Sequence, residues 1–319
     1  MLSRVADSCL WTSRYIERAE SSARILDVNI QLMLDFEDQN GAAPSQQWLP
    51  ILATLEDQEI FHEVYDSLTS DAVMEFITFE KANPNSIRSC VTLARENART
   101  VREQISSEMW EQINGLYLYF QTPAARASFR ESPIGFYRTL VNSLHSFQGI
   151  TDATMTHGEG WQFLQLGKYI ERADSTSRVL DFKYHVLLPS EERVGGNVDI
   201  TQWMAVLRSC SAMEAYLKIF HGRVTSWEVA EFLILHDSFP RSIRFCVDAL
   251  DQALHSISGC ARSHFSNEAE RLSGLLRSNL NFTTVRSIFQ LGLHQYLDQT
   301  QIRLTEVSNA LTDIYCRWL

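Results

Sequence analysis

The sequence predicts an all-α protein, a helical bundle built from two duplicated halves related by a pseudo-twofold axis. Apolar residues recur with helical period along most of the chain, and the alternation expected of strands is almost absent. Of 319 residues only 13 are glycine and 7 are proline, while 45% are hydrophobic, a composition that suits a helix-rich globular protein. The duplication is indicated by residues 15–20, which return as residues 169–174 with Glu20 replaced by Asp174 as the only change.

The first half is predicted to form a long helix followed by shorter ones. The expected helices cover residues 3–34, 48–55, 58–67, 71–79, 83–106 and 108–120, with a last one beginning near residue 134. Asn83 is expected to cap the fifth helix because Pro84 would then occupy the first turn, where its missing N–H is harmless. We expect a loop at residues 121–133.

The second half repeats this order at an offset that drifts from 154 to 156 residues. Residues 161–188 match the first helix, residues 229–232 match 73–76, and residues 240–247 match 84–91. Sequence similarity between the halves fades beyond these segments, and residues 279–289 and 291–319 are predicted to form two long helices. We therefore expect halves at residues 1–155 and 156–319, packed as one unit, because the repeat is far longer than a solenoid repeat.

Charge and cysteine usage restrict the partners and the compartment. A formal net charge of −11 and a pI near 5.3 repel phosphate backbones, so nucleic acid is not expected as a partner. No apolar run is long enough to span a bilayer, and Asp7 interrupts the position where a signal peptide would continue its apolar core. The six cysteines show no C-x-x-C pair, which is typical of reduced thiols. We expect a cytoplasmic protein.

The repeated stretch has two open interpretations. Glu20 and Arg24 are spaced i, i+4, as are Asp174 and Arg178, the favourable order for a helical ion pair. This explains those four residues structurally but leaves the glutamate and arginine of each Glu-Arg pair unexplained. Either these pairs join the two halves, or they line a site between them. The residues concerned are Glu17, Arg18, Glu171 and Arg172.

A second candidate site is a stripe of arginines on one predicted helix. Four arginines lie within about 60° of one another on the helical wheel, at positions Arg88, Arg95, Arg99 and Arg102. The corresponding residues of the other half are Arg244, Asp251, His255 and Ser258, so only one half keeps the stripe. Either Glu96, Glu103 and acids of neighbouring helices neutralise the arginines, or the stripe binds a carboxylate or phosphate, both of which suit guanidinium groups.

Other motifs give no support for a metal or a cofactor. Glu59 and His62 have the spacing of a di-iron ligand pair, but such sites need a second Glu-x-x-His. His236 and Asp237 resemble the dyad of helical HD-type phosphohydrolases without a counterpart in the other half. Because the sequence has no P-loop, no G-x-G-x-x-G, no G-x-S-x-G and no cysteine-histidine zinc spacing, we predict no metal and no cofactor.

The Glu-Arg repeat and three further segments resemble the bacterial alpha-E family, named for an all-helical domain with a Glu-Arg motif. These segments are residues 95–99, residues 107–114 with Trp110 and Asn114, and residues 160–167 leading into the second Glu-Arg pair. Lys168 stands where the family pattern suggests arginine. The resemblance implies a circularly permuted ATP-grasp protein as a partner, often with a transglutaminase-like cysteine peptidase, and hence a role in amide ligation or peptide tagging.

Two functions follow. In the first, the chain is a non-catalytic scaffold that binds the ATP-grasp protein and holds its acceptor against the arginines. In the second, it is an enzyme of the same system with Glu17 and Glu171 as acid/base carboxylates. We favour the first, so no catalytic residue is assigned. The candidate binding residues are Arg18, Arg172, Arg24, Arg178, Arg88, Arg95, Arg99, Arg102 and Asn97.

Overall fold

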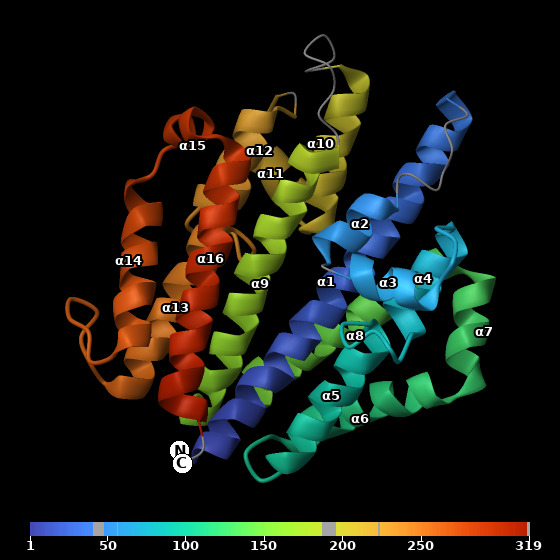
Figure 1. The fold of residues 1–319 in the computed structure, drawn as a ribbon. Coiled ribbons are helices and arrows are strands. Elements are labelled where there is room, and N and C mark those ends of the chain that lie inside the picture. Colours follow the sequence, from blue (N-terminus) through green and yellow to red (C-terminus); the bar gives the residue numbers. More distant parts are fainter. Residues whose placement is uncertain (41–47, 56, 187–195, 223, 318–319) are drawn as a thin grey trace. The chain divides into compact units, whose positions relative to one another are not determined.

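The computed structural model describes residues 1–40, 48–55, 57–186, 196–222 and 224–317. These residues form sixteen α-helices and no strand, which confirms the all-α prediction (Figure 1). They divide into an N-terminal unit, residues 11–156, and a C-terminal unit, residues 1–10 with 157–319. Within the described residues, no helix combines the length and the apolar character that crossing a bilayer requires.

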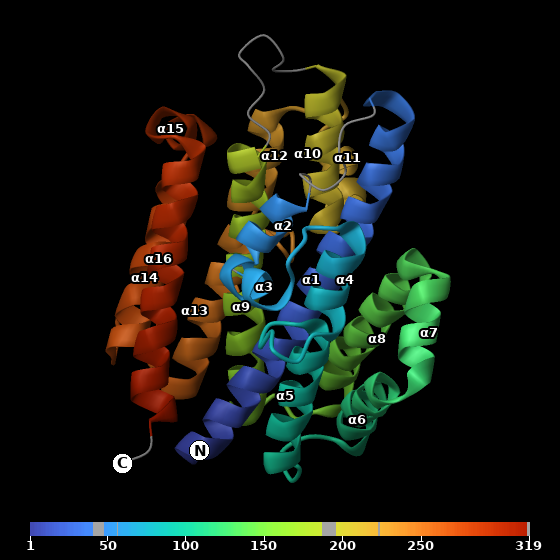
Figure 2. The same cartoon turned by 45° about the vertical axis from the view of Figure 1, so that its right-hand side comes forward.

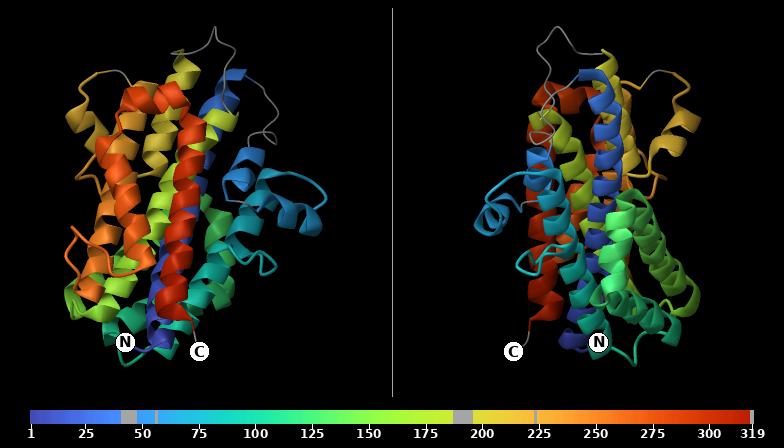
Figure 3. Two further views of the ribbon diagram at one scale, coloured as in Figure 1. Left: turned by 60° about the vertical axis from the view of Figure 1, so that its left-hand side comes forward. Right: turned by 90° about the vertical axis from the view of Figure 1, so that its right-hand side faces the viewer.

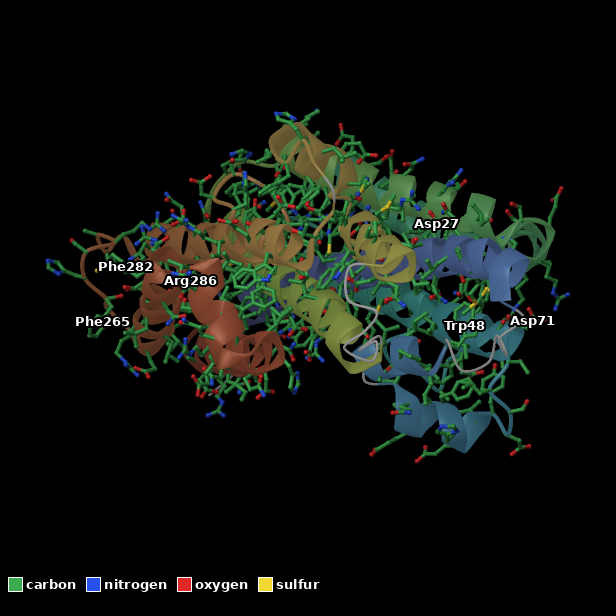
Figure 4. All side chains as sticks on the ribbon, turned by 90° about the horizontal axis from the view of Figure 1, so that it is seen from above. Asp27, Trp48, Asp71, Phe265, Phe282 and Arg286 are labelled. Atoms are coloured by element: carbon green, nitrogen blue, oxygen red, sulfur yellow. The ribbon has the colours of Figure 1, made fainter. Side chains whose placement is uncertain are left out.

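The N-terminal unit contains most of α1 and seven further helices. Their bounds are α1 Ser3–Asn40, α2 Leu49–Thr54, α3 Gln58–Val64, α4 Ser70–Phe79, α5 Ile87–Thr100, α6 Ser107–Gln121, α7 Pro123–Glu131 and α8 Pro133–Thr154. Helices α6, α7 and α8 pack against one another (Figure 3). Trp48, whose indole N–H donates to Ser70 Oγ at 2.8 Å, lies in the same part of this unit as Asp71 (Figure 4).

The C-terminal unit contains eight helices and a final short π-helix. Their bounds are α9 Glu159–Val186, α10 Asn197–Ser209, α11 Met213–Ile219, α12 Ser226–Leu235, α13 Ile243–Ser258, α14 Glu268–Phe282, α15 Val285–Leu291, α16 Leu293–Leu311 and the π-helix Thr312–Cys316. Helices α9, α13, α14 and α16 lie side by side along most of their length (Figures 1 and 2). They form the main body of this unit.

The helices at matching positions of the repeat are capped alike. Thr69 and Thr225 cap α4 and α12, and each side chain accepts from the backbone N–H three residues later. Ser86 and Ser242 do the same for α5 and α13. The pseudo-twofold relation between the halves stays a prediction.

The expected cap of α5 was wrong. The helix begins at Ile87 with Ser86 as its N-cap, and it ends at Thr100 rather than near residue 106. Asn83 instead accepts from the Asn85 backbone N–H at 2.8 Å and donates to Asp57 at 2.9 Å. The asparagine thus shapes the turn before the helix, a local role that competes with helix capping for this residue type.

The loop expected at residues 121–133 was also wrong, because residues 123–131 form α7. Pro123 and Pro133 each stand at the start of a helix, where proline is tolerated, so they mark two helix beginnings rather than one long loop. Phe129 of α7 is 8% exposed, and its ring lies 5.3 Å from Phe79 and 5.7 Å from Phe136. Burial in this aromatic cluster stabilises the short helix.

The single helix expected at residues 279–289 is two helices. Helix α14 ends at Phe282, and α15 begins at Val285 with Thr284 as its N-cap, which forms a capping box with Ser287. Gly292, with φ of +103°, then separates α15 from α16, a backbone conformation that residues other than glycine rarely adopt.

Candidate functional site

The arginine of the first Glu-Arg pair holds the turn before α5. Arg18 on α1 donates to Asn85 Oδ1 at 2.8 Å. Asn85 donates onward to Asp57 Oδ1 at 3.0 Å, and Asn83 donates to the other oxygen of the same carboxylate. These hydrogen bonds connect α1, the start of α3 and the start of α5. The carboxylate at their centre is buried, since Asp57 is 1% exposed.

The arginine of the second pair contacts the matching turn. Arg172 on α9 donates to the backbone oxygen of Pro240 at 3.3 Å, and Thr176, one turn further along α9, donates to that of Arg241 at 2.9 Å. Residues 240 and 241 directly precede Ser242, the N-cap of α13. The two Glu-Arg arginines therefore have the same structural role, each within its own unit.

The predicted i, i+4 ion pairs are confirmed, but their surroundings differ. Glu20 and Arg24 pair with side chains only 3% and 9% exposed, and His145 Nε2 lies 3.0 Å from Glu20. Asp174 and Arg178 pair at 2.7 Å with both side chains 25% exposed. One pair is thus buried and the other partly solvated.

The two candidate catalytic glutamates are buried, in different units. Glu17 is 3% exposed and accepts from Gln148 Nε2 at 2.8 Å, and Glu171 is 5% exposed. The burial of Glu17 fits its place on the helical wheel, where Leu10 and Val28 lie on the same side of α1. A shared site of Glu17 and Glu171 is one of the two interpretations that the sequence leaves open.

Three of the four stripe arginines form a surface that we call the arginine face, made of Arg95, Arg99 and Arg102 with Glu96, Trp110, Asn114 and Tyr117. Arg95 donates to Asn114 Oδ1 at 3.1 Å, and its guanidinium carbon lies 5.2 Å from the Trp110 ring centroid and 4.9 Å from that of Tyr117. Arg102 lies 5.5 Å from the Trp110 centroid. The aromatic rings of α6 therefore position two arginines through cation–π contacts.

The arginine face carries more positive than negative charge. Glu96 pairs with Arg95 and lies 2.6 Å from Arg99. Glu103, the other acid expected to neutralise the stripe, forms no ion pair with these arginines in the described part of the chain. The side chain of Arg99 is 64% exposed. Glu96 thus pairs with two of the three arginines and no ion pair neutralises Arg102 among the described residues, an arrangement suited to binding carboxylate or phosphate.

Two other candidates do not belong to this face. Arg88 donates to Gln121 Oε1 at 3.1 Å near the end of α6, much as Arg244 donates to Asn281 Oδ1 at 3.0 Å near the end of α14, so it has a structural role. Asn97 follows Arg95 by two residues and so lies on another side of α5.

The sequence alone did not predict a site role for Tyr117, Gln148 and His145. Tyr117 follows Trp110 and Asn114 at i+7 and i+3, the spacing of one helix face, so its place in the arginine face was predictable. Gln148 and His145 lie on α8, and no local pattern relates them to α1. Their contacts depend on tertiary packing.

Comparisons with known proteins give relatives and a family for this chain. Uncharacterized proteins of Mycobacterium bovis and Mycobacterium tuberculosis are 23% identical to the chain over 293 residues, which is 87% of this chain and 32% of each relative. The chain thus spans about a third of the length of these relatives. No solved structure matches the chain. A family model described as a predicted alpha-helical domain with a conserved ER motif matches residues 1–316. The chain therefore belongs to the Alpha-E family.

Proposed function

We propose that this chain is a non-catalytic helical partner in an ATP-grasp-dependent amide-ligation or peptide-tagging system. The observation that carries the proposal is the arginine face, where Arg99 and Arg102 are exposed beside a single paired carboxylate. The net charge of the whole chain is −11, so this basic surface stands out against an acidic protein. Such a patch attracts an anionic partner and orients its approach.

The contacts that the Glu-Arg pairs make favour a non-catalytic partner function of this chain over a catalytic one. Arg18 and Arg172 hold the turns before α5 and α13, and Arg24 and Arg178 pair with their own helix neighbours. Side chains engaged in positioning backbone and in ion pairs are poorly placed to bind a substrate as well. The motif is then the frame that holds α5 and its arginines in place.

Two further observations fit this proposal. The curated relatives carry the matching region as 32% of a longer protein, as expected if this unit works beside other domains. None of the six cysteines forms a disulfide bond, which suits the cytoplasm, where we propose the system operates. The partners we propose are a circularly permuted ATP-grasp protein and, in addition, a transglutaminase-like peptidase.

The test is a native pull-down with identification by mass spectrometry. Wild type and Arg99→Ala/Arg102→Ala are compared with Arg130→Ala, an exposed arginine of α7 that serves as the charge control. We expect wild type and the control to retain an ATP-grasp protein, and the double variant to lose most of it, with binding that weakens as salt rises. Chromatographic elution of the chain that is unchanged by its co-purified ligase would contradict the proposal.

A catalytic function of this chain is the second candidate, because Glu17 and Glu171 are buried. A carboxylate that is 3% or 5% exposed can acquire the shifted pKa that acid/base catalysis requires. Glu17→Gln and Glu171→Gln keep the shape of each side chain. If both variants fold normally and support full ligation in a reconstituted system, the enzyme candidate is excluded.

A further inference from the structure

The C-terminal unit has replaced the arginine face by acidic and imidazole side chains. The residues of α13 that match Arg95 and Arg99 are Asp251 and His255. The segment is also longer, because α13 has 16 residues where α5 has 14, and the loop to α14 covers residues 259–267 where the first half has 101–106. This longer segment includes Cys260.

His255, Cys260 and Glu270 come together at this loop. One ligand atom from each residue can be chosen so that all three lie within 4.8 Å of one another. The side chains of His255 and Glu270 are 5% and 0% exposed, and His255 Nδ1 lies 3.8 Å from Glu270 Oε2. Cys260 is only half-buried, so the cluster is reached from the loop side, which also carries the 61% exposed Phe265 (Figure 4).

The buried carboxylate of Glu270 lacks the cationic partners of its neighbour Asp251. Arg262 Nε lies 2.8 Å from Asp251, and Arg277 Nε lies 3.8 Å away. Glu270 accepts instead from neutral donors, including the Ser266 N–H at 2.6 Å and Asn267 Nδ2 at 2.9 Å. Among the described residues, only His255 can bring a positive charge within 4.0 Å of it. These hydrogen bonds compensate for the burial of the carboxylate, which remains an anionic oxygen donor for a metal cation.

Asp251 is placed to support His255 as a ligand. Its Oδ1 lies 3.6 Å from His255 Nε2, on the opposite side of the ring from Glu270. A carboxylate behind the second ring nitrogen fixes the tautomer and raises the basicity of many metal-binding histidines. In this structure Nδ1 lies 3.1 Å from the Cys260 backbone oxygen, so Nδ1 carries the proton and donates it there.

We propose that His255 Nδ1, Cys260 Sγ and a Glu270 carboxylate oxygen bind a zinc ion. Nitrogen, thiolate sulfur and carboxylate oxygen are the donors that zinc prefers, and three protein ligands leave a fourth position for water or another molecule. On binding, the Cys260 thiol releases its proton to solvent, and the His255 proton moves from Nδ1 to Nε2, facing Asp251. The site is independent of the proposed function.

Binding requires a modest closure of the loop. In tetrahedral zinc sites the ligand atoms lie about 3.3–3.7 Å apart, as follows from bond lengths of about 2.0–2.3 Å. The three side chains therefore approach one another by roughly 1 Å, and His255 gives up its contact with the Cys260 backbone oxygen. Because Cys260 lies in a loop rather than a helix, the loop accommodates most of this movement.

The experiment is a titration of the chelator-treated full chain with Co²⁺, followed by displacement with Zn²⁺. Wild type should bind one Co²⁺ per chain with a thiolate-to-cobalt charge-transfer absorption that zinc abolishes. Cys260→Ser should lose this absorption and weaken Co²⁺ binding at least tenfold, and His255→Gln should weaken it similarly. Cys316→Ser is the matched control, because burial, together with the nearby Asp7, raises the pKa of that thiol to about 12 and so keeps it protonated.

The variant Cys260→His distinguishes the loss of a thiolate ligand from a folding defect. It supplies an imidazole in place of the thiolate, so Co²⁺ binding should persist while the charge-transfer absorption disappears. A wild-type protein that shows no such absorption would overturn the proposal. The same conclusion follows if Cys260→Ser keeps the absorption of wild type, because another cysteine would then be the ligand.

Discussion

Arg18 and Arg172 show what single residues of the repeated motif contribute. Each arginine connects a long helix to the turn before the next capped helix, through Asn85 in one unit and the Pro240 backbone oxygen in the other. The two contacts differ in chemistry, one to a side chain and one to a backbone oxygen. An arginine with five donors in a planar fork can make either, which explains how both copies keep the residue while the turns differ.

Replacing Arg18 should destabilise the N-terminal unit. Arg18→Ala leaves Asn85 without its donor, and we expect a loss of about 1–3 kcal/mol in the free energy of unfolding. Arg130→Ala, on an exposed side of α7, should stay within about 0.5 kcal/mol of wild type. Urea unfolding followed by circular dichroism measures both, and equal midpoints for the two variants would rule out this role.

The two copies of the i, i+4 ion pair provide an internal comparison. Glu20→Ala leaves Arg24 charged with a side chain only 9% exposed, which should cost about 3–5 kcal/mol. Asp174→Ala removes the equivalent acid from a pair that is 25% exposed, where about 0.2–1 kcal/mol is expected. Thermal unfolding of both variants tests the difference, and similar shifts in Tm would contradict it.

Asp248 should contribute to the loss of folding stability at low pH. Burial alone would raise its pKa, but hydrogen bonds from Arg277 and Arg262 outweigh this and lower the pKa below its usual value. A lowered folded-state pKa gives stability that is present above the unfolded-state pKa of about 3.9 and is lost as the pH falls through the folded-state pKa. Below pH of about 4, the free energy of unfolding should fall less steeply for Asp248→Asn than for wild type. The exposed Asp237→Asn is the control, and equal slopes for Asp248→Asn and wild type would refute the prediction.

At the scale of elements, the sequence predicts every helix of the first half except α7. The start of α1 at Ser3 and the bounds of α2 and α4 follow from periodicity and polar breaks. Helix α7 was missed because its two flanking prolines indicate a loop as readily as two helix starts. What decides between them is Phe129, whose burial against Phe79 comes from residues 50 positions away. No local pattern contains that information.

Two glycines of the C-terminal unit should respond oppositely to alanine. Gly292 has φ of +103°, so Gly292→Ala should destabilise by about 1–3 kcal/mol. Gly274 lies within α14, and a Cβ added there meets nothing within 4 Å. Gly274→Ala should therefore stabilise the protein by about 0.5–1 kcal/mol. Chemical denaturation of both variants checks the signs, and a stabilised Gly292→Ala would contradict this account of the break between α15 and α16.

At the scale of the whole molecule, the two halves have the same helix order but different surfaces. The arginine face of α5 and α6 corresponds to the acidic and imidazole cluster around α13. The sequence predicted this divergence, because the matched positions can be read directly from the repeat. It could not predict that Arg95 and Arg102 of the α5 segment would both lie over Trp110 of α6, nor that Cys260 and Glu270 would join His255, since these contacts connect different helices and loops. The repeat in the sequence thus relates two halves that carry different side chains at matching positions.

The central claim is that the chain acts on a partner enzyme through the arginine face. The most direct measurement is ATP turnover by the co-purified ATP-grasp protein, alone, with wild-type chain, with Arg99→Ala/Arg102→Ala and with Arg130→Ala. We predict that wild type and Arg130→Ala raise turnover equally and that the double variant needs at least a tenfold higher concentration for the same effect. Turnover that is the same with and without the chain would contradict the claim.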